Sequence, residues 1–124
     1  MKAMVLKKIG PLQEGETRLE PAELPVPEPG DHELLVRVTA CGVCHTELDE
    51  IEGRTPPPTL PVILGHQIVG RVERTGKHVT RFTTGDRVGI GWIHSSCGSC
   101  SYCRSGNDNL CQQFTAPGPD VSGR

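Results

Sequence analysis

Four cysteines near the carboxyl-terminal end carry the strongest chemical signal in the sequence. Three are separated by two residues each and the fourth follows one loop later, at Cys97, Cys100, Cys103 and Cys111. Thiolates at such spacing can converge on one ion, at about 2.3 Å from the metal in a zinc site. The stretch has little apolar content, so something other than a hydrophobic core must hold it. The spacing therefore predicts a closed tetrahedral metal site.

Three kinds of site compete for these cysteines: structural zinc, an iron–sulfur cluster and disulfides. A bacterial ferredoxin motif also opens with Cys-x₂-Cys-x₂-Cys, but it continues with x₃-Cys-Pro. Here seven residues precede Cys111, and Gln112 follows it. The sequence has no apolar run that could span a membrane and no signal-peptide core, so we expect a cytoplasmic location. In that reducing compartment, structural zinc is the favoured interpretation.

Cys44 and His66 form a second and weaker constellation. A single cysteine and a single histidine this far apart are more often a core thiol and a structural imidazole. However, Cys44 lies just after a predicted strand, at the mouth of a turn, and Gly65 allows tight placement of the imidazole. Two protein ligands are one fewer than the three that catalytic zinc normally has. The pair alone therefore predicts a metal site only weakly.

The elements that must position these residues are mostly short strands. Fifteen glycines and eleven prolines in 124 residues predict many turns and no long helices. The run Thr46-Glu47-Leu48-Asp49 has a helix-start pattern and predicts a short helix over residues 46–52. Aromatic residues are few, so the core must be aliphatic. Apolar patterning predicts strands at residues 1–9, 17–24, 34–40, 68–74 and 87–92.

Four stretches of the chain have an order and spacing that are typical of one protein family. They are Cys41-Gly42-Val43-Cys44-His45-Thr46-Glu47-Leu48, Gly65-His66-Gln67, Gly85-Asp86-Arg87-Val88 and the four-cysteine lobe. In this order and spacing the chain resembles the zinc-dependent alcohol dehydrogenases of the medium-chain dehydrogenase/reductase superfamily. The resemblance covers essentially all of residues 1–124. It implies the amino-terminal catalytic domain, a mainly β GroES-like β-barrel, with a zinc-bound lobe at about residues 93–113.

The resemblance also implies a reaction and the residues that serve it. Cys44 and His66 resemble two ligands of a catalytic zinc, and Gln67 holds a position close behind that metal. Zinc with an open position lowers the pKa of a bound alcohol, and Thr46 resembles the hydroxyl that passes the proton outward. A hydride then goes to NAD or NADP, converting a primary or secondary alcohol to an aldehyde or ketone.

Other positions receive supporting roles from the same resemblance. His45 resembles the residue that contacts the cofactor pyrophosphate, and Trp92 resembles a wall of the substrate pocket. Cys41 matches no ligand, so we interpret it as a core thiol at a strand end. The resemblance implies that structural zinc is held by Cys97, Cys100, Cys103 and Cys111.

The sequence departs from the family pattern in three respects. Gln67 stands where most members have a glutamate, and Asp49 stands where relatives often have a histidine that ends a proton relay. The family's third catalytic-zinc ligand, a cysteine, would lie well beyond residue 124. No Gly-x-Gly-x-x-Gly stretch is present, so the Rossmann cofactor domain is not in this sequence. We therefore expect the isolated 124-residue chain to be inactive without that domain as a partner.

Composition limits the remaining partners. The net charge of −2 gives no basic stripe for nucleic acid or an acidic membrane surface. A small alcohol or aldehyde is the expected substrate, and the full-length form could be a homo-oligomer. The alternative is a zinc-stabilised GroES-like binding module without catalytic activity. His32 and His78 lie in polar turns and are predicted to be solvated, and residues 112–124 are predicted to fray.

Overall fold

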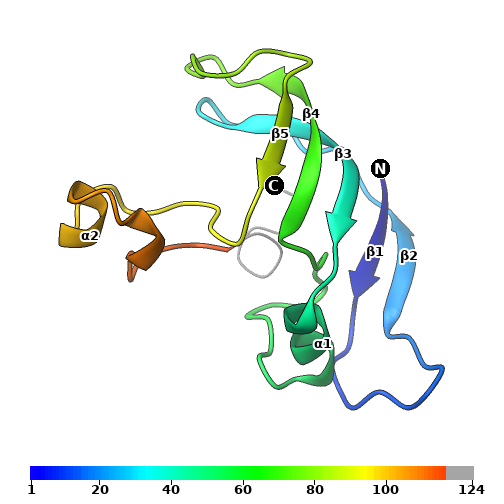
Figure 1. Cartoon of the computed structure of the whole chain (residues 1–124). Helices are drawn as coiled ribbons and strands as arrows, with labels where there is room; N and C mark the ends of the chain where they lie inside the picture. The colour runs from blue at the N-terminus through cyan, green and yellow to red at the C-terminus, as the bar shows by residue number, and fades with distance from the viewer. Residues whose placement is uncertain (117–124) are drawn as a thin grey trace.

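The computed structural model describes residues 1–116, in which five strands form two antiparallel sheets (Figure 1). The smaller sheet pairs β1 (Lys2–Leu6) with β2 (Leu19–Glu23). In the larger sheet, β4 (Gln67–Thr75) lies between β3 (Leu34–Gly42) and β5 (Arg87–Ile90). All five predicted strands are present with slightly different ends. The predicted mainly β fold is therefore confirmed.

The structure corrects the predicted start of the first helix. α1 (His45–Glu52) is capped by Cys44, whose Sγ accepts a hydrogen bond from the Thr46 N–H at 3.4 Å. The Cys44 N–H in turn donates to Glu47 Oε2 at 2.7 Å, which completes a reciprocal capping box. The Thr46-x-x-Asp49 pattern is therefore not the cap, because a thiol two residues earlier takes that place. The helix ends at Gly53, whose φ of 82° suits a residue without a side chain.

The two sheets do not close into a barrel within residues 1–116. A bridge between Leu6 and Val62 ties the smaller sheet to the loop after α1, and both side chains are fully buried. The buried apolar residues include no aromatic side chain, as expected for an aliphatic core. Cys41 lies at the end of β3 but is exposed on a groove of about 640 Å³, so the expectation of a core thiol is wrong. The cause is the open sheet, which leaves this strand face uncovered.

The four-cysteine lobe projects beside the larger sheet (Figure 1). It contains two short helices that the sequence did not predict, α2 (Ser101–Arg104) and the 3₁₀ helix η1 (Asp108–Leu110). Ser95 and Thr115 pair at its base, and Ala116 is buried. Residues 112–116 therefore do not follow the predicted fraying, and residues 117–124 lie outside the described part. No helix in that part is long and apolar enough to cross a membrane.

Candidate metal centres

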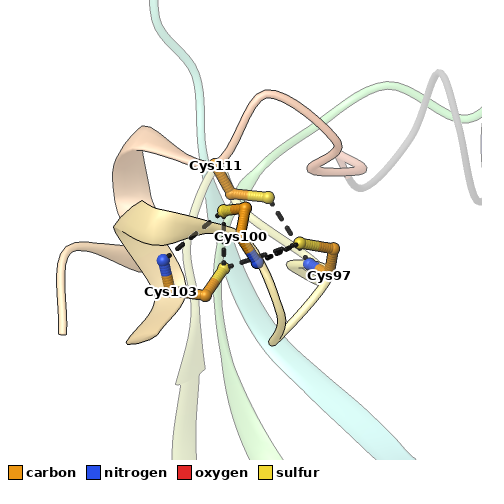
Figure 2. A group of neighbouring side chains, drawn as sticks. All are labelled: Cys97, Cys100, Cys103 and Cys111. Atoms are coloured by element: carbon orange, nitrogen blue, oxygen red, sulfur yellow. Dashed lines mark hydrogen bonds between the residues drawn. The ribbon is translucent and has the colours of Figure 1, made fainter. Parts of the chain in front are cut away.

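The four cysteines of the lobe converge as their spacing predicts. Figure 2 shows their side chains directed toward one another, and their sulfur atoms all lie within 4.8 Å of each other. Cys100 Sγ is 3.5 Å from Cys103 Sγ, which is 3.9 Å from Cys97 Sγ. Sulfurs held at about 2.3 Å from a zinc ion in a tetrahedron stand about 3.8 Å apart. A disulfide needs only about 2.05 Å, and all six cysteines are free, so zinc fits and disulfides do not.

Backbone amides inside the lobe already point at the sulfur atoms. The N–H groups of Cys97, Cys100 and Gln113 donate to cysteine sulfurs at 3.3–3.4 Å. Hydrogen bonds from backbone N–H groups of Ser99 and Cys100 lower the pKa of Cys97 to about 6. Burial raises the pKa of Cys103 to about 11. The loop therefore supplies one thiolate at neutral pH and aims donors at the charge that a metal site accumulates.

The second constellation also converges. Cys44 Sγ lies 3.3 Å from His66 Nε2, although the two residues come from the cap of α1 and from the loop before β4. His66 is 7% exposed, whereas Cys44 is half-buried. The thiol and the imidazole nitrogen are therefore placed to bind one ion at the edge of the protein interior. Both atoms are suitable zinc ligands, so the donor set fits that metal.

Glu47 belongs to this centre and was missed as a site residue in the sequence. It is 6% exposed, and its Oε1 lies 3.0 Å from His66 Nδ1 while its Oε2 accepts from the Cys44 N–H. A carboxylate this close to Nδ1 favours a proton on that nitrogen, which leaves Nε2 free for a metal. Glu47 could have been found from the Cys44-x-x-Glu47 spacing, which is that of a capping box with a thiol in place of the usual hydroxyl.

The other predicted site residues differ in how close they lie to this centre. Trp92 packs its edge against His66, with ring centroids 4.6 Å apart and planes at 83°, and it is 43% exposed. Thr46 is half-buried in the first turn of α1. The His45 side chain is 80% exposed and near Asp49. Trp92 thus lies against the imidazole of the centre while much of its ring stays exposed.

The Gln67 side chain packs over Gly42 in this structure. It is exposed, and its side-chain oxygen lies over Gly42, 2.6 Å from where a Cβ on that glycine would stand. It makes no hydrogen bond to Cys44 or His66 among the described residues. Glu47, not Gln67, therefore supplies the carboxylate that contacts the imidazole.

A buried carboxylate lies one helical turn beyond Glu47. Glu50 is 4% exposed, and its Oε2 has no hydrogen-bond partner in the described part of the chain. Burial, followed by the charge of Glu47, raises the pKa of Glu50 from 4.5 to about 7. Between pH 4.5 and about 7, the Glu50 carboxyl keeps its proton in the folded state and loses it in the unfolded state. Stability falls as the pH rises from about 4.5 through about 7.

Replacing Glu50 with glutamine is expected to stabilise the protein more at pH 8 than at pH 5.5. The gain at pH 8 should be roughly 2 kcal/mol, because an amide has no charge to desolvate. Urea unfolding of both proteins at the two pH values measures the difference. The exposed control Glu23→Gln should show no such pH dependence. An equal effect of Glu50→Gln at both pH values would contradict the burial argument.

Together, the open β fold and the two thiol-containing centres define a zinc-binding β domain. The family model described as the alcohol dehydrogenase GroES-like domain matches residues 30–123, and the chain belongs to this family. The resemblance inferred from the sequence is therefore confirmed.

Individual relatives agree with this assignment. An alcohol dehydrogenase from Geobacillus stearothermophilus is 46% identical over 106 residues, which cover 85% of this chain and 32% of the relative. Among solved structures, an NAD-dependent alcohol dehydrogenase superposes with a TM-score of 0.86 at 38% identity, covering 99% of this chain and 35% of that one. A cobalt- and zinc-bound thermostable alcohol dehydrogenase from Pyrobaculum aerophilum gives 0.78 at 28% identity, covering 99% and 33%. The chain spans about a third of the length of these relatives.

Proposed function

We propose that residues 1–124 are the catalytic domain of a zinc-dependent alcohol dehydrogenase. In this proposal the domain acts on a small primary or secondary alcohol together with NAD or NADP. The convergence of Cys44 Sγ and His66 Nε2 at 3.3 Å, with Glu47 behind the imidazole, is the observation that carries it. The lobe at about residues 93–113 would hold a structural zinc and take no part in the chemistry.

The residues around the second centre would have three roles in the reaction: metal binding, proton transfer and lining of the substrate pocket. Cys44 and His66 would hold a zinc ion, which polarises an alcohol oxygen and favours loss of its proton. Thr46 stands two residues after Cys44 in the same turn, and its hydroxyl can accept one proton while donating another. Trp92 would line the side from which the alcohol enters.

Asp49 is poorly suited to receive the proton that Thr46 passes on. Arg54 Nε donates to its carboxylate at 2.5 Å, and this hydrogen bond lowers the pKa of Asp49. His45 Nδ1 lies 3.4 Å from the same carboxylate. An acid whose pKa lies below its ordinary value stays ionised at neutral pH, so Asp49 does not hold a proton there. We infer that Thr46 would pass its proton to water, or to the ribose of a bound cofactor, and not to Asp49.

Alcohol oxidation would also require a third metal ligand and a cofactor-binding domain, which residues 1–124 do not include. A third protein ligand for the metal and a Rossmann domain for NAD or NADP would come from beyond residue 124. The isolated chain is accordingly expected to oxidise no alcohol. The alternative function is a zinc-stabilised binding module, and the exposed, neutral Gln67 in place of a glutamate favours it.

A chimera distinguishes the two functions. The matching 106 residues of the Geobacillus stearothermophilus alcohol dehydrogenase would be replaced by those of this chain, and alcohol oxidation measured with NAD⁺ and NADP⁺. We expect activity within about 100-fold of the parent enzyme, because losses from imperfect positioning are of this size. Cys44→Ser in the chimera should abolish it.

The matched control is Cys41→Ser in the same chimera, since Cys41 lies outside both metal centres. It should leave the activity unchanged. A chimera that folds, holds two zinc ions and shows no activity with either cofactor would favour the binding module instead.

A further inference from the structure

His32 and His78 meet at the end of the larger sheet that is far from both metal centres. Their ring centroids lie 5.0 Å apart and their planes are tilted by 33°. His32 lies in the turn before β3, and His78 lies in the turn after β4. Figure 1 shows these two turns together at the top of the molecule, with α1 at the bottom. Both histidines are exposed, so neither is needed for the core.

The separation of the two rings suits shared coordination of one ion. Imidazole nitrogens bind late first-row metals at about 2.0–2.1 Å. For nitrogen–metal–nitrogen angles between about 90° and 110°, two such rings have centroids about 4.5 to 5.5 Å apart. The observed 5.0 Å falls inside this range. The ring separation therefore allows one nitrogen of each ring to reach the same ion once the rings turn to face it.

The backbone fixes the two turns against each other. The His78 N–H donates to Asp31 O at 2.8 Å, and the Gly76 N–H donates to Glu33 O at 2.8 Å. A Cβ on Gly76 would stand only 2.1 Å from Gly30 O, so the close approach requires glycine there. These contacts hold both histidine backbones in place before any ion arrives. A preorganised pair loses less entropy on binding than two independent side chains.

Asp31, Glu33 and Lys77 are the charged residues next to the pair in the chain. Lys77 precedes His78 in the chain, and its Nζ is 2.7 Å from Asp31 Oδ2, so that carboxylate offsets its charge. Glu33 Oε2 accepts from the Gly30 N–H at 2.8 Å and lies in the same turn. Arg81, further along the turn after β4, makes no ion pair within residues 1–116, and its guanidinium lies over the Phe82 ring at 5.8 Å.

We propose that His32 and His78 form a third metal site, specific for a late first-row divalent cation such as nickel, copper or zinc. Neutral imidazole suits these ions, and calcium and magnesium prefer oxygen ligands. The ion would link the turn before β3 to the turn after β4. The site is separate from the proposed alcohol dehydrogenase chemistry. Either proposal can therefore be wrong without affecting the other.

Nickel titration tests the proposal, with the chain first brought to two bound zinc ions so that the two cysteine-containing centres are filled. We expect one nickel ion to bind, and His32→Ala or His78→Ala to weaken it about tenfold or more, because each loss breaks the chelate. His94→Ala is the matched histidine control and should leave the affinity unchanged. The same titration of Cys44→Ser excludes nickel exchange at the second centre and should give the same affinity.

Amide hydrogen exchange reports where the ion binds. At a nickel concentration of 100 times the dissociation constant, exchange of the His78 and Gly76 amides through opening of the site should slow about 100-fold. Exchange in the lobe should not change. A nickel affinity that is unchanged in either single histidine variant, the absence of binding, or unchanged exchange at these two amides would overturn the proposal.

Discussion

Replacing Cys111 with serine is expected to release the zinc ion of the lobe and unfold residues 93–113. Cys111 is 2% exposed, and its sulfur accepts N–H groups from Cys97 and Gln113, so it joins the two ends of the lobe. Structural zinc in small thiolate sites contributes apparent binding free energies of about 10–16 kcal/mol. The lobe has almost no buried apolar side chains to compensate for the loss of that energy. This is the largest effect we expect from a single substitution.

Metal analysis and amide exchange measure this effect together. The variant should contain one zinc ion fewer per chain, and the amides of α2 and η1 should lose their protection. Cys41→Ser is the control, because Cys41 belongs to neither group of metal-binding side chains. Its metal content and lobe exchange should equal those of the parent. Full protection of the lobe in Cys111→Ser would show that zinc does not hold it.

Replacing Glu47 with alanine is expected to weaken zinc at the second centre 10- to 100-fold. The carboxylate contacts both ligands, because Oε1 lies 3.0 Å from His66 Nδ1 and Oε2 accepts from the Cys44 N–H. Loss of a carboxylate behind a metal-binding histidine typically costs about this much affinity. The helix also loses part of its cap, at about 0.5–2 kcal/mol of stability. The substitution therefore affects metal affinity and folding through the same two contacts.

A second variant separates the two effects. Glu47→Gln retains an oxygen that can accept from the Cys44 N–H but removes the charge beside His66. It should keep most of the helix stability and still bind zinc more weakly than the parent. Glu52→Ala, at the other end of α1, is the control for general helix damage. Competition with a zinc chelator gives the affinities, and a purely structural role for Glu47 would leave them unchanged.

The sequence predicted the lobe well because its information is local. Ligands two residues apart are brought together by a tight turn, so Cys97, Cys100 and Cys103 need little help from distant strands. The strands were also predictable, since their apolar patterns lie within short segments. Pairing of Cys44 with His66 required the family resemblance, because an entire helix and a long loop separate them.

Other features depended on side-chain geometry that patterns do not carry. Thr46 looked like a helix cap because hydroxyls usually fill that position, yet a thiol caps α1. The position of the Gln67 side chain over Gly42 could not be read from the sequence, and its place behind the metal stays a prediction. The open sheets and the exposed Cys41 depend on which strands pair across the whole chain. Short sequence windows contain no information on that closure.

The number of zinc ions bound per chain tests most directly whether this is a two-centre dehydrogenase domain. Equilibrium dialysis against free zinc, followed by metal analysis, should give two ions in the parent with His32 and His78 both replaced by alanine. Adding Cys44→Ser or His66→Ala should reduce the count to one, held by the four-cysteine lobe. A single zinc ion that is unaffected by loss of Cys44 or His66 would contradict the proposed catalytic centre.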